Sequence, residues 1–204
     1  MPRFLLSLVG LVTLVLVQIS PAQALPTLDE AMKDRFLGKT DAPVTITEYS
    51  SLTCPHCMAF HRDVLPDIKK AYIDTGKVRL VFRDFPLGGL AMAAAMMARC
   101  AQPERYFGLI ETLFRSQSDW SRSQDPLNAL SRIGRFAGLP DKDVQACFQR
   151  RDLWKAIQTR ADNAGKKHKI NATPSFIIGK RTISGGLPFA EFKKIIETEL
   201  SKKK

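Results

Sequence analysis

Two cysteines separated by two residues constrain the fold of this chain more than any other feature. The stretch "EYSSLTCPHCMAF" places Cys54 and Cys57 after an alternating apolar and polar run, 44–51, that predicts a strand. From Pro55 onward, apolar residues recur at helical spacing, and Pro66 predicts a kink in that helix. The cysteine pair therefore lies where a strand passes into a helix. Unpaired backbone N–H groups of the first helical turn should point toward it.

The N-terminus indicates the compartment. Arg3 precedes an apolar run of 16 residues, 4–19, and the sequence "AQA" at 22–24 fits a signal-peptidase site. The run is shorter than the roughly 18–20 residues that span a bilayer comfortably, which argues against a retained anchor. We expect a signal peptide, residues 1–24, cleaved after Ala24. Whether the segment is a cleaved signal peptide or a retained anchor, the rest of the chain is exported to a compartment where disulfides can form.

The remaining residues read as β-α-β, a helical block, and β-β-α. Residues 28–42 read as a short lead-in that ends in a turn, and 77–85 as a second strand. Residues 90–165 hold five helical patterns and no strand signal. A short apolar strand then leads into a Gly179-Lys180 turn and another strand, and "LPFAEFKKIIETEL" closes the chain as an amphipathic helix.

Charge adds little to this interpretation. The formal net charge is +11, but basic residues are scattered, and the one dense cluster between predicted elements is "KKHK" at 166–169. A basic surface on a soluble exported protein accounts for this distribution, so we expect no nucleic-acid partner.

The Cys-Pro-His-Cys motif admits several chemical interpretations. Covalent haem attachment needs histidine directly after the second cysteine, and this chain has Met58. A structural zinc site in a non-enzymatic binding or chaperone module needs two more ligands, and Cys100 and Cys147 do not form a second close pair. A purely structural disulfide would close too small a loop to stabilise much. A reversible redox couple fits best, with no metal.

The position of Cys54 supports redox chemistry. The start of the helix, together with a cationic or hydrogen-bonding His56, should stabilise a thiolate there. A stabilised thiolate leaves readily and favours the reduced protein, which makes the disulfide form an oxidant of other thiols. Cys57, one turn into the helix, should be buried and act as the resolving thiol.

Taken together, the Cys-Pro-His-Cys motif, the strand before it, the helical insertion and "TPSF" ahead of a closing hairpin resemble the bacterial DsbA family. These are thioredoxin-fold thiol:disulfide oxidoreductases of the periplasm. The lead "GKTDAPVTITEYSSLTCPHC" is similar to the DsbA-like branch of alphaproteobacteria. The resemblance covers essentially the whole chain after the signal peptide. It implies a thioredoxin fold in two parts, 25–87 and 169–204, interrupted by an all-helical domain, 88–168.

The resemblance also implies a catalytic set of Cys54, Pro55, His56 and Cys57. The redox-active disulfide would be the only redox group, without a diffusible cofactor. The expected partners are reduced exported polypeptides and a quinone-linked membrane oxidase of the DsbB type that restores the disulfide. We expect a monomer.

Pro174 matches the place of the family's cis-proline, and the resemblance implies that Thr173 offers its backbone to an extended substrate strand. Thr173 is also a departure, because the best-known oxidases carry a branched apolar residue there and the related isomerases often carry threonine. An isomerase or reductase that works mainly reduced is therefore the alternative. Those isomerases dimerise through a dedicated N-terminal domain, for which the 19 residues 25–43 are too few.

Glu48 lies on the strand face shared with Val44 and Ile46. We expect a half-buried acid with a raised pKa that accepts a proton from Cys57, a spacing that also resembles the family pattern. The alternative is an exposed carboxylate at the strand end. Arg79 or Arg83 on the next strand could balance its charge. We interpret His61 as a helix-surface or packing residue rather than a catalytic one.

Cys100 and Cys147 fall in separate predicted helices of the insertion. In an oxidising compartment, two remaining cysteines in one helical domain are expected to pair. A bridge closing 47 residues could stabilise the fold by up to about 4 kcal/mol.

Overall fold

The computed structural model describes residues 24–203, so the expected signal peptide lies outside the described residues except for Ala24. Within that range, no helix combines the length and apolarity that crossing a membrane requires. The elements follow in order: α1 (Leu28–Met32), β1 (Arg35–Leu37), β2 (Val44–Ser50), α2 (Pro55–Asp63), α3 (Leu65–Ile68), π-helical η1 (Lys69–Ile73), β3 (Val78–Asp84), α4 (Gly89–Cys100), α5 (Pro103–Arg115), α6 (Gln117–Ser121), α7 (Pro126–Phe136), α8 (Asp141–Phe148), α9 (Arg151–His168), β4 (Ser175–Ile178), β5 (Arg181–Ser184) and α10 (Phe189–Ser201).

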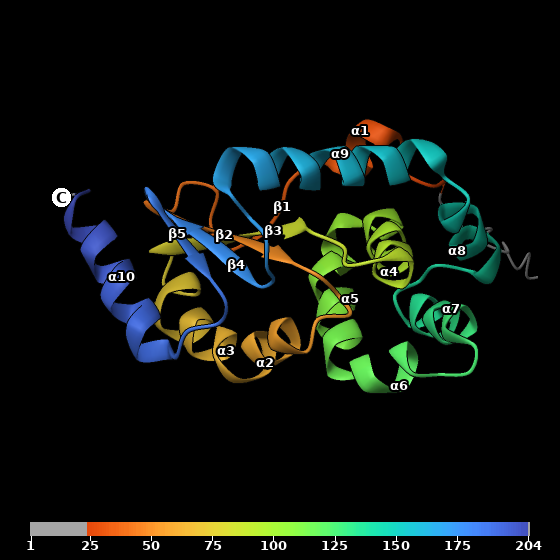
Figure 1. Cartoon of the computed structure of the whole chain (residues 1–204), viewed down its shortest axis with the longest axis horizontal. Helices are drawn as coiled ribbons and strands as arrows, with labels where there is room; N and C mark the ends of the chain where they lie inside the picture. The colour runs from red at the N-terminus through yellow and green to blue at the C-terminus, as the bar shows by residue number, and fades with distance from the viewer. Residues whose placement is uncertain (1–23, 204) are drawn as a thin grey trace, which may run out of the picture.

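The strands form one sheet in the order β1-β3-β2-β4-β5. β2 and β3 are parallel and every other neighbouring pair is antiparallel. Helices α2, α3 and α10 lie on one side of the sheet and α9 on the other (Figure 1). This is the thioredoxin-type arrangement that the β-α-β and β-β-α patterns predict, and the active cysteines follow its central strand β2.

Alternation along β2 and β3 decides which side chains face which layer. Parallel pairing places Ile46 opposite Leu80 and Glu48 opposite Phe82, and these residues face α2. The intervening residues face α9, where Tyr49 packs with residues from the far layer. Because side chains alternate with period two, the register alone fixes the surroundings of every residue near the cysteines.

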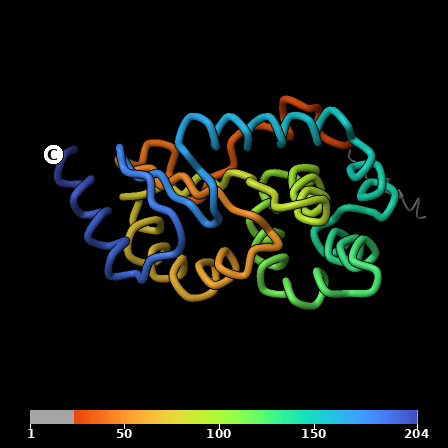
Figure 2. Tube along the Cα trace, in the orientation of Figure 1, coloured from red at the N-terminus to blue at the C-terminus, as the bar shows by residue number. Residues whose placement is uncertain are grey.

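The segment between β3 and β4 is entirely helical, as expected. Helices α4 to α8 pack at one end of the sheet, and the long α9 runs back along the molecule to reach β4, a path that Figure 2 traces in one continuous colour series. We call α4–α9 the helical lobe. Its apolar core is continuous with Leu52, Cys54 and Cys57, so the lobe packs directly against the cysteine motif.

Three short elements were not expected from the sequence: α1, β1 and α6. The first two fall in the segment read as a lead-in. β1 pairs antiparallel with β3 as an edge strand, and the chain then turns at Gly38, where φ is +98°. A Cβ atom there would come within 2.7 Å of the Val78 carbonyl oxygen, so the turn requires glycine.

Candidate active site

The cysteine motif lies at the carboxyl end of β2 and the start of α2. Cys54 is the N-cap of α2 and Pro55 occupies the first turn, which proline favours because its missing N–H would be unpaired there. Both cysteines are free thiols; Cys54 is 6% exposed and Cys57 is fully buried. Cys54 thus keeps a small exposed area, whereas Cys57 has none.

The surroundings lower the pKa of the Cys54 thiol to about 5. The largest cause is a hydrogen bond from the Cys57 thiol, followed by the Thr173 side chain and backbone N–H groups of the first helical turn, against an opposing effect of burial. His56 contributes through its backbone N–H, and its side chain is exposed. The N–H donors beside the sulfur thus come from the start of the helix, and the role of the His56 imidazole remains a prediction.

Burial has the opposite effect on the second thiol. It raises the pKa of Cys57 well above the usual range, and the hydrogen bond to Cys54 and the charge of Glu48 act in the same direction. The two sulfurs therefore differ in role at neutral pH. Cys54 is the thiolate, and Cys57 keeps its proton until another group removes it.

The loop before β4 completes the surface around Cys54. The Thr173–Pro174 peptide bond is cis, as expected. The Cys54 thiol lies 3.2 Å from the Thr173 carbonyl oxygen, to which it can donate. Thr173 Oγ1 has no hydrogen-bond partner among the described residues, so it is free to donate to the sulfur once the thiol ionises.

Glu48 lies under the motif, and the structure corrects two expectations about it. The residue is completely buried, not half-buried. Its partner is neither Arg79 nor Arg83 but His61, whose Nε2 lies 3.1 Å from both carboxylate oxygens. The reason is the parallel register: Glu48 pairs with Phe82, so the two arginines point to the opposite face of the sheet.

Arg79 and Arg83 contact other residues instead. Arg79 donates to the Thr45 hydroxyl at 2.9 Å, and Arg83 forms an ion pair with Asp34 at 2.7 Å. The interpretation of His61 as a surface or packing residue is incomplete, because it packs and also holds the buried carboxylate.

Gln117 is a site residue that the sequence did not reveal. It belongs to the short helix α6, is 4% exposed, and its Nε2 donates to the carbonyl oxygens of Leu52 at 2.8 Å and Cys54 at 3.0 Å. The helical lobe therefore holds the turn that presents the reactive sulfur.

The other two cysteines are joined to each other. Cys100 at the end of α4 and Cys147 in α8 form a disulfide with a Cα–Cα distance of 6.4 Å. They are thus not available as zinc ligands. Among residues 24–203, no group of three or more His, Cys, Asp or Glu side chains gathers as a metal site.

Comparison with known proteins gives consistent matches. A family model described as thioredoxin matches residues 30–198. The crystal structure of alpha-DsbA1 from Wolbachia pipientis shares 33% identity with a TM-score of 0.78, over 88% of this chain and 94% of that one. Oxidised BdbD from Bacillus subtilis shares 25% identity with a TM-score of 0.75, over 87% of this chain and 96% of that one.

Curated relatives agree with the structural matches. A provisionally named protein-disulfide oxidoreductase of Rickettsia prowazekii is 30% identical over 162 residues, which are 79% of this chain and 59% of that protein. The chain therefore spans about three fifths of the length of that relative. Disulfide bond formation protein D of Bacillus subtilis is 27% identical, over 82% of this chain and 77% of that one.

Proposed function

This chain belongs to the thioredoxin-fold family of DsbA-like protein-disulfide oxidoreductases, and from that premise we propose that it is an exported oxidase that donates its Cys54–Cys57 disulfide to reduced cysteines of exported proteins. The observation that carries the proposal is the contrast between the two thiols. The pKa of Cys54 is lowered to about 5, whereas burial raises that of Cys57. The lowered pKa of Cys54 stabilises the reduced pair and makes the disulfide an oxidant.

The proposed cycle begins with a substrate thiolate. It attacks Cys54 Sγ, the Cys54–Cys57 bond breaks, and Cys57 leaves with the electron pair and takes up a proton. A second substrate thiolate attacks the substrate sulfur of the mixed disulfide, which forms the product disulfide and releases Cys54 as a thiolate. Two electrons pass from substrate to the cysteine pair. Thr173 and Pro174, beside the sulfur, would bind the substrate as an added strand.

The reverse half of the cycle needs an external oxidant. Cys54 thiolate would attack a disulfide of the quinone-linked membrane oxidase, and Cys57 would then attack Cys54 Sγ to close the pair. Cys57 must lose its proton for this step, and Glu48, whose charge reaches that sulfur, is the group proposed to accept it. The step is then general base catalysis within a buried site.

A paired assay tests the direction of exchange. The oxidised protein is mixed with a reduced peptide containing two cysteines, and in parallel the reduced protein is mixed with a scrambled disulfide substrate. We expect stoichiometric oxidation of the peptide and little repair, with Cys54→Ser inactive in both. Efficient repair with little peptide oxidation would instead establish the isomerase that Thr173 suggests, and inactivity in both assays would overturn the proposal.

Export is tested on the same protein. Fractionation of the producing cells should recover the protein outside the cytoplasm, and N-terminal sequencing should begin at Leu25. Recovery in the cytoplasm with Arg3 still present would contradict this part of the proposal.

A further inference from the structure

We propose that His61 is a positioning residue of the exchange reaction, which holds the buried Glu48 carboxylate and connects it to solvent through a pocket between α2 and α5. The inference rests on the proposed function and adds the route by which the proton of Cys57 leaves. It starts from an observation that the cycle above does not use: a completely buried carboxylate whose side-chain partner is an imidazole at the wall of a pocket.

The geometry of the pair is specific. His61 Nε2 lies 3.1 Å from each oxygen of Glu48, with side-chain exposures of 6% and 0%. The imidazole is held by aromatic rings, with centroid distances of 5.6 Å to Phe60, 6.0 Å to Phe82 and 4.2 Å to Phe114. Such apolar surroundings strengthen an interaction between charged groups and limit rotation of the ring.

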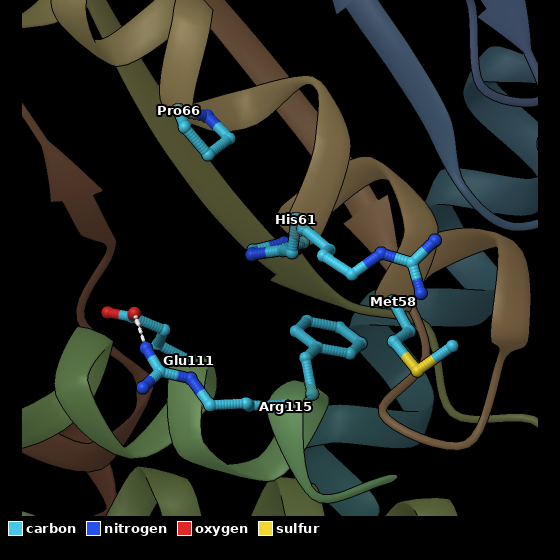
Figure 3. A pocket seen from close by; sticks show the side chains of 7 residues that line it. Met58, His61, Pro66, Glu111 and Arg115 are labelled. Carbon is cyan, nitrogen blue, oxygen red and sulfur yellow. Dashed lines mark hydrogen bonds and ion pairs between the residues drawn. The ribbon is translucent and has the colours of Figure 1, made fainter. Parts of the chain in front are cut away.

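His61 also stands between the cysteine and the pocket. Cys57 and His61 are four residues apart in α2, so they share one helix face on successive turns. The pocket has a volume of about 310 Å³ and is lined by Met58, His61, Arg62, Pro66, Glu111, Phe114 and Arg115. Figure 3 shows His61 above the pocket, with Glu111 and Arg115 of α5 opposite.

The other ionisable groups around the imidazole are already compensated. Glu111 and Arg115 form an ion pair with each other along α5, and Arg62 pairs with the adjacent aspartate at 2.7 Å. Tyr106 of α5 is fully buried, which raises its pKa and keeps it neutral. Among the described residues, His61 is therefore the ionisable group that contacts both the buried carboxylate and the pocket.

The step that uses this arrangement is closure of the disulfide. Cys57 loses its proton to Glu48 and attacks Cys54 Sγ, the Cys54–partner bond breaks, and the partner sulfur leaves as a thiolate. Before this step the His61 imidazolium donates its Nε2–H to the Glu48 carboxylate. Once Glu48 holds the Cys57 proton, that ion pair is lost, and the imidazolium becomes neutral by giving its Nδ1 proton to water in the pocket. When a substrate later reduces the pair, Cys57 regains a proton by the reverse route.

Two variants and a matched control test the proposal. His61→Gln keeps a hydrogen-bond donor but cannot take up and release a proton, and His61→Phe keeps an aromatic ring without either property. Arg62→Gln alters the same pocket at a side chain that is 65% exposed. Each reduced protein is mixed with oxidised glutathione and quenched with acid, and mass spectrometry measures the Cys54–glutathione disulfide and its conversion to the closed pair.

In both His61 variants we expect the mixed disulfide to form at the wild-type rate and closure to slow by about 100-fold, as loss of general base assistance predicts. Closure should then rise with hydroxide concentration, whereas wild type and Arg62→Gln remain level around neutral pH. Closure at the wild-type rate in His61→Gln would overturn the proposal. So would slowing by one constant factor at every pH, which indicates displaced structure.

The two proposals fail in different ways. If the proposed function is wrong, the wild-type protein will not oxidise the reduced peptide, whatever the His61 variants do. If only the role of His61 is wrong, the wild-type protein will oxidise the peptide and the His61 variants will close normally. Denaturation curves of both variants show whether they are folded, and His61→Gln alone is sufficient if the larger ring is not accommodated.

Discussion

Cys54 and Cys57 lie one helical turn apart, yet their environments favour opposite protonation states. The difference comes from position along α2. Cys54 caps the helix and faces N–H donors, whereas Cys57 lies inside the first turn with apolar neighbours and the charge of Glu48. The hydrogen bond between the two sulfurs reinforces both effects, since it stabilises one thiolate and one thiol.

This contrast predicts how stability depends on pH. The surroundings in the folded reduced protein lower the pKa of Cys54 to about 5 from the ordinary value of 9.0, which we take for the unfolded chain. A lowered pKa adds stability that is complete above the unfolded value and is lost as pH falls through the folded value. Disulfide-bonded cysteines do not titrate, so the free energy of unfolding of the reduced form minus that of the oxidised form should rise from pH 5 to pH 9.

Guanidinium unfolding of both redox forms between pH 5 and pH 9 measures this difference in the free energy of unfolding. Most other titrating groups contribute equally to both forms, so their contributions cancel. Cys57 does not affect the window, because its raised pKa matters only above the unfolded value. A flat difference would show that Cys54 titrates as an ordinary thiol. The Cys54→Ser variant is the control. Its free energy of unfolding, minus that of the oxidised wild-type protein, should show no such rise from pH 5 to pH 9.

At the residue level, the sequence predicts chemistry better than it predicts contacts. The roles of Cys54 and Cys57 follow from their place between a strand and a helix. The predicted partner of Glu48 was wrong because the prediction considered which strand is its neighbour, but not which residues of that strand face the same side of the sheet. Alternation alone shows that Arg79 and Arg83 face away once Glu48 is set opposite Phe82. A histidine four residues after Cys57 was the signal available in the sequence.

At the scale of elements, α6 fixes the reactive turn through one side chain. Gln117 is the donor for two carbonyl groups of that turn, at Leu52 and Cys54. Replacing Gln117 with leucine should leave the Leu52 carbonyl unpaired, at a cost of about 1–3 kcal/mol in the free energy of unfolding, whereas the Cys54 carbonyl keeps its bond from the Met58 N–H at 3.1 Å. Hydrogen exchange of the amides in 52–58 should become faster. Gln149→Leu, at an exposed position, is the matched control and should change neither quantity.

The disulfide between α4 and α8 gives a second prediction at this scale. Cys100 is 1% exposed and Cys147 is fully buried, so alanine is a better replacement than serine because it buries no unpaired hydroxyl. The bridge closes a loop of 47 residues, and its loss should lower the free energy of unfolding by up to about 4 kcal/mol. Denaturant titration of the Cys100→Ala/Cys147→Ala protein measures this loss, and an unchanged midpoint would contradict it.

The long, patterned elements were predictable and the short ones were not. Alternation predicts β2 and β3, apolar periodicity predicts the longer helices, and the Gly179-Lys180 turn predicts the closing hairpin. The helix α6 has five residues and β1 has three, which is too few for either period to be recognised. Their formation depends on tertiary contacts, as the edge pairing of β1 with β3 shows.

At the scale of the whole molecule, the helical lobe and the sheet are joined by buried polar and apolar contacts. Arg99 of α4 donates to Asp84 at the end of β3 at 2.7 Å and to the Lys33 carbonyl at 2.8 Å, so it links the lobe, the sheet and the N-terminal segment. Removing one partner of such a buried ion pair is costly because the other charge is left uncompensated.

These connections bear on the division into 25–87, 88–168 and 169–204, which remains a prediction about folding units. One apolar core contains Phe82 of β3, the cysteine motif and residues of α4 to α9. If one part unfolded, the other part could no longer keep its share of that apolar surface buried. We therefore expect a single cooperative transition for lobe and sheet.

Two probes placed in different parts test this expectation. Both tryptophans, Trp120 and Trp154, belong to the helical lobe, so their fluorescence reports its unfolding. In the Cys54→Ser protein, the buried Cys57 of α2 is the remaining free thiol, and its labelling by a maleimide reports opening of the core around α2. Because the two parts share a core, both curves should have one denaturant midpoint. Loss of tryptophan signal at a lower concentration, with Cys57 still protected, would show that the lobe is a separate folding unit.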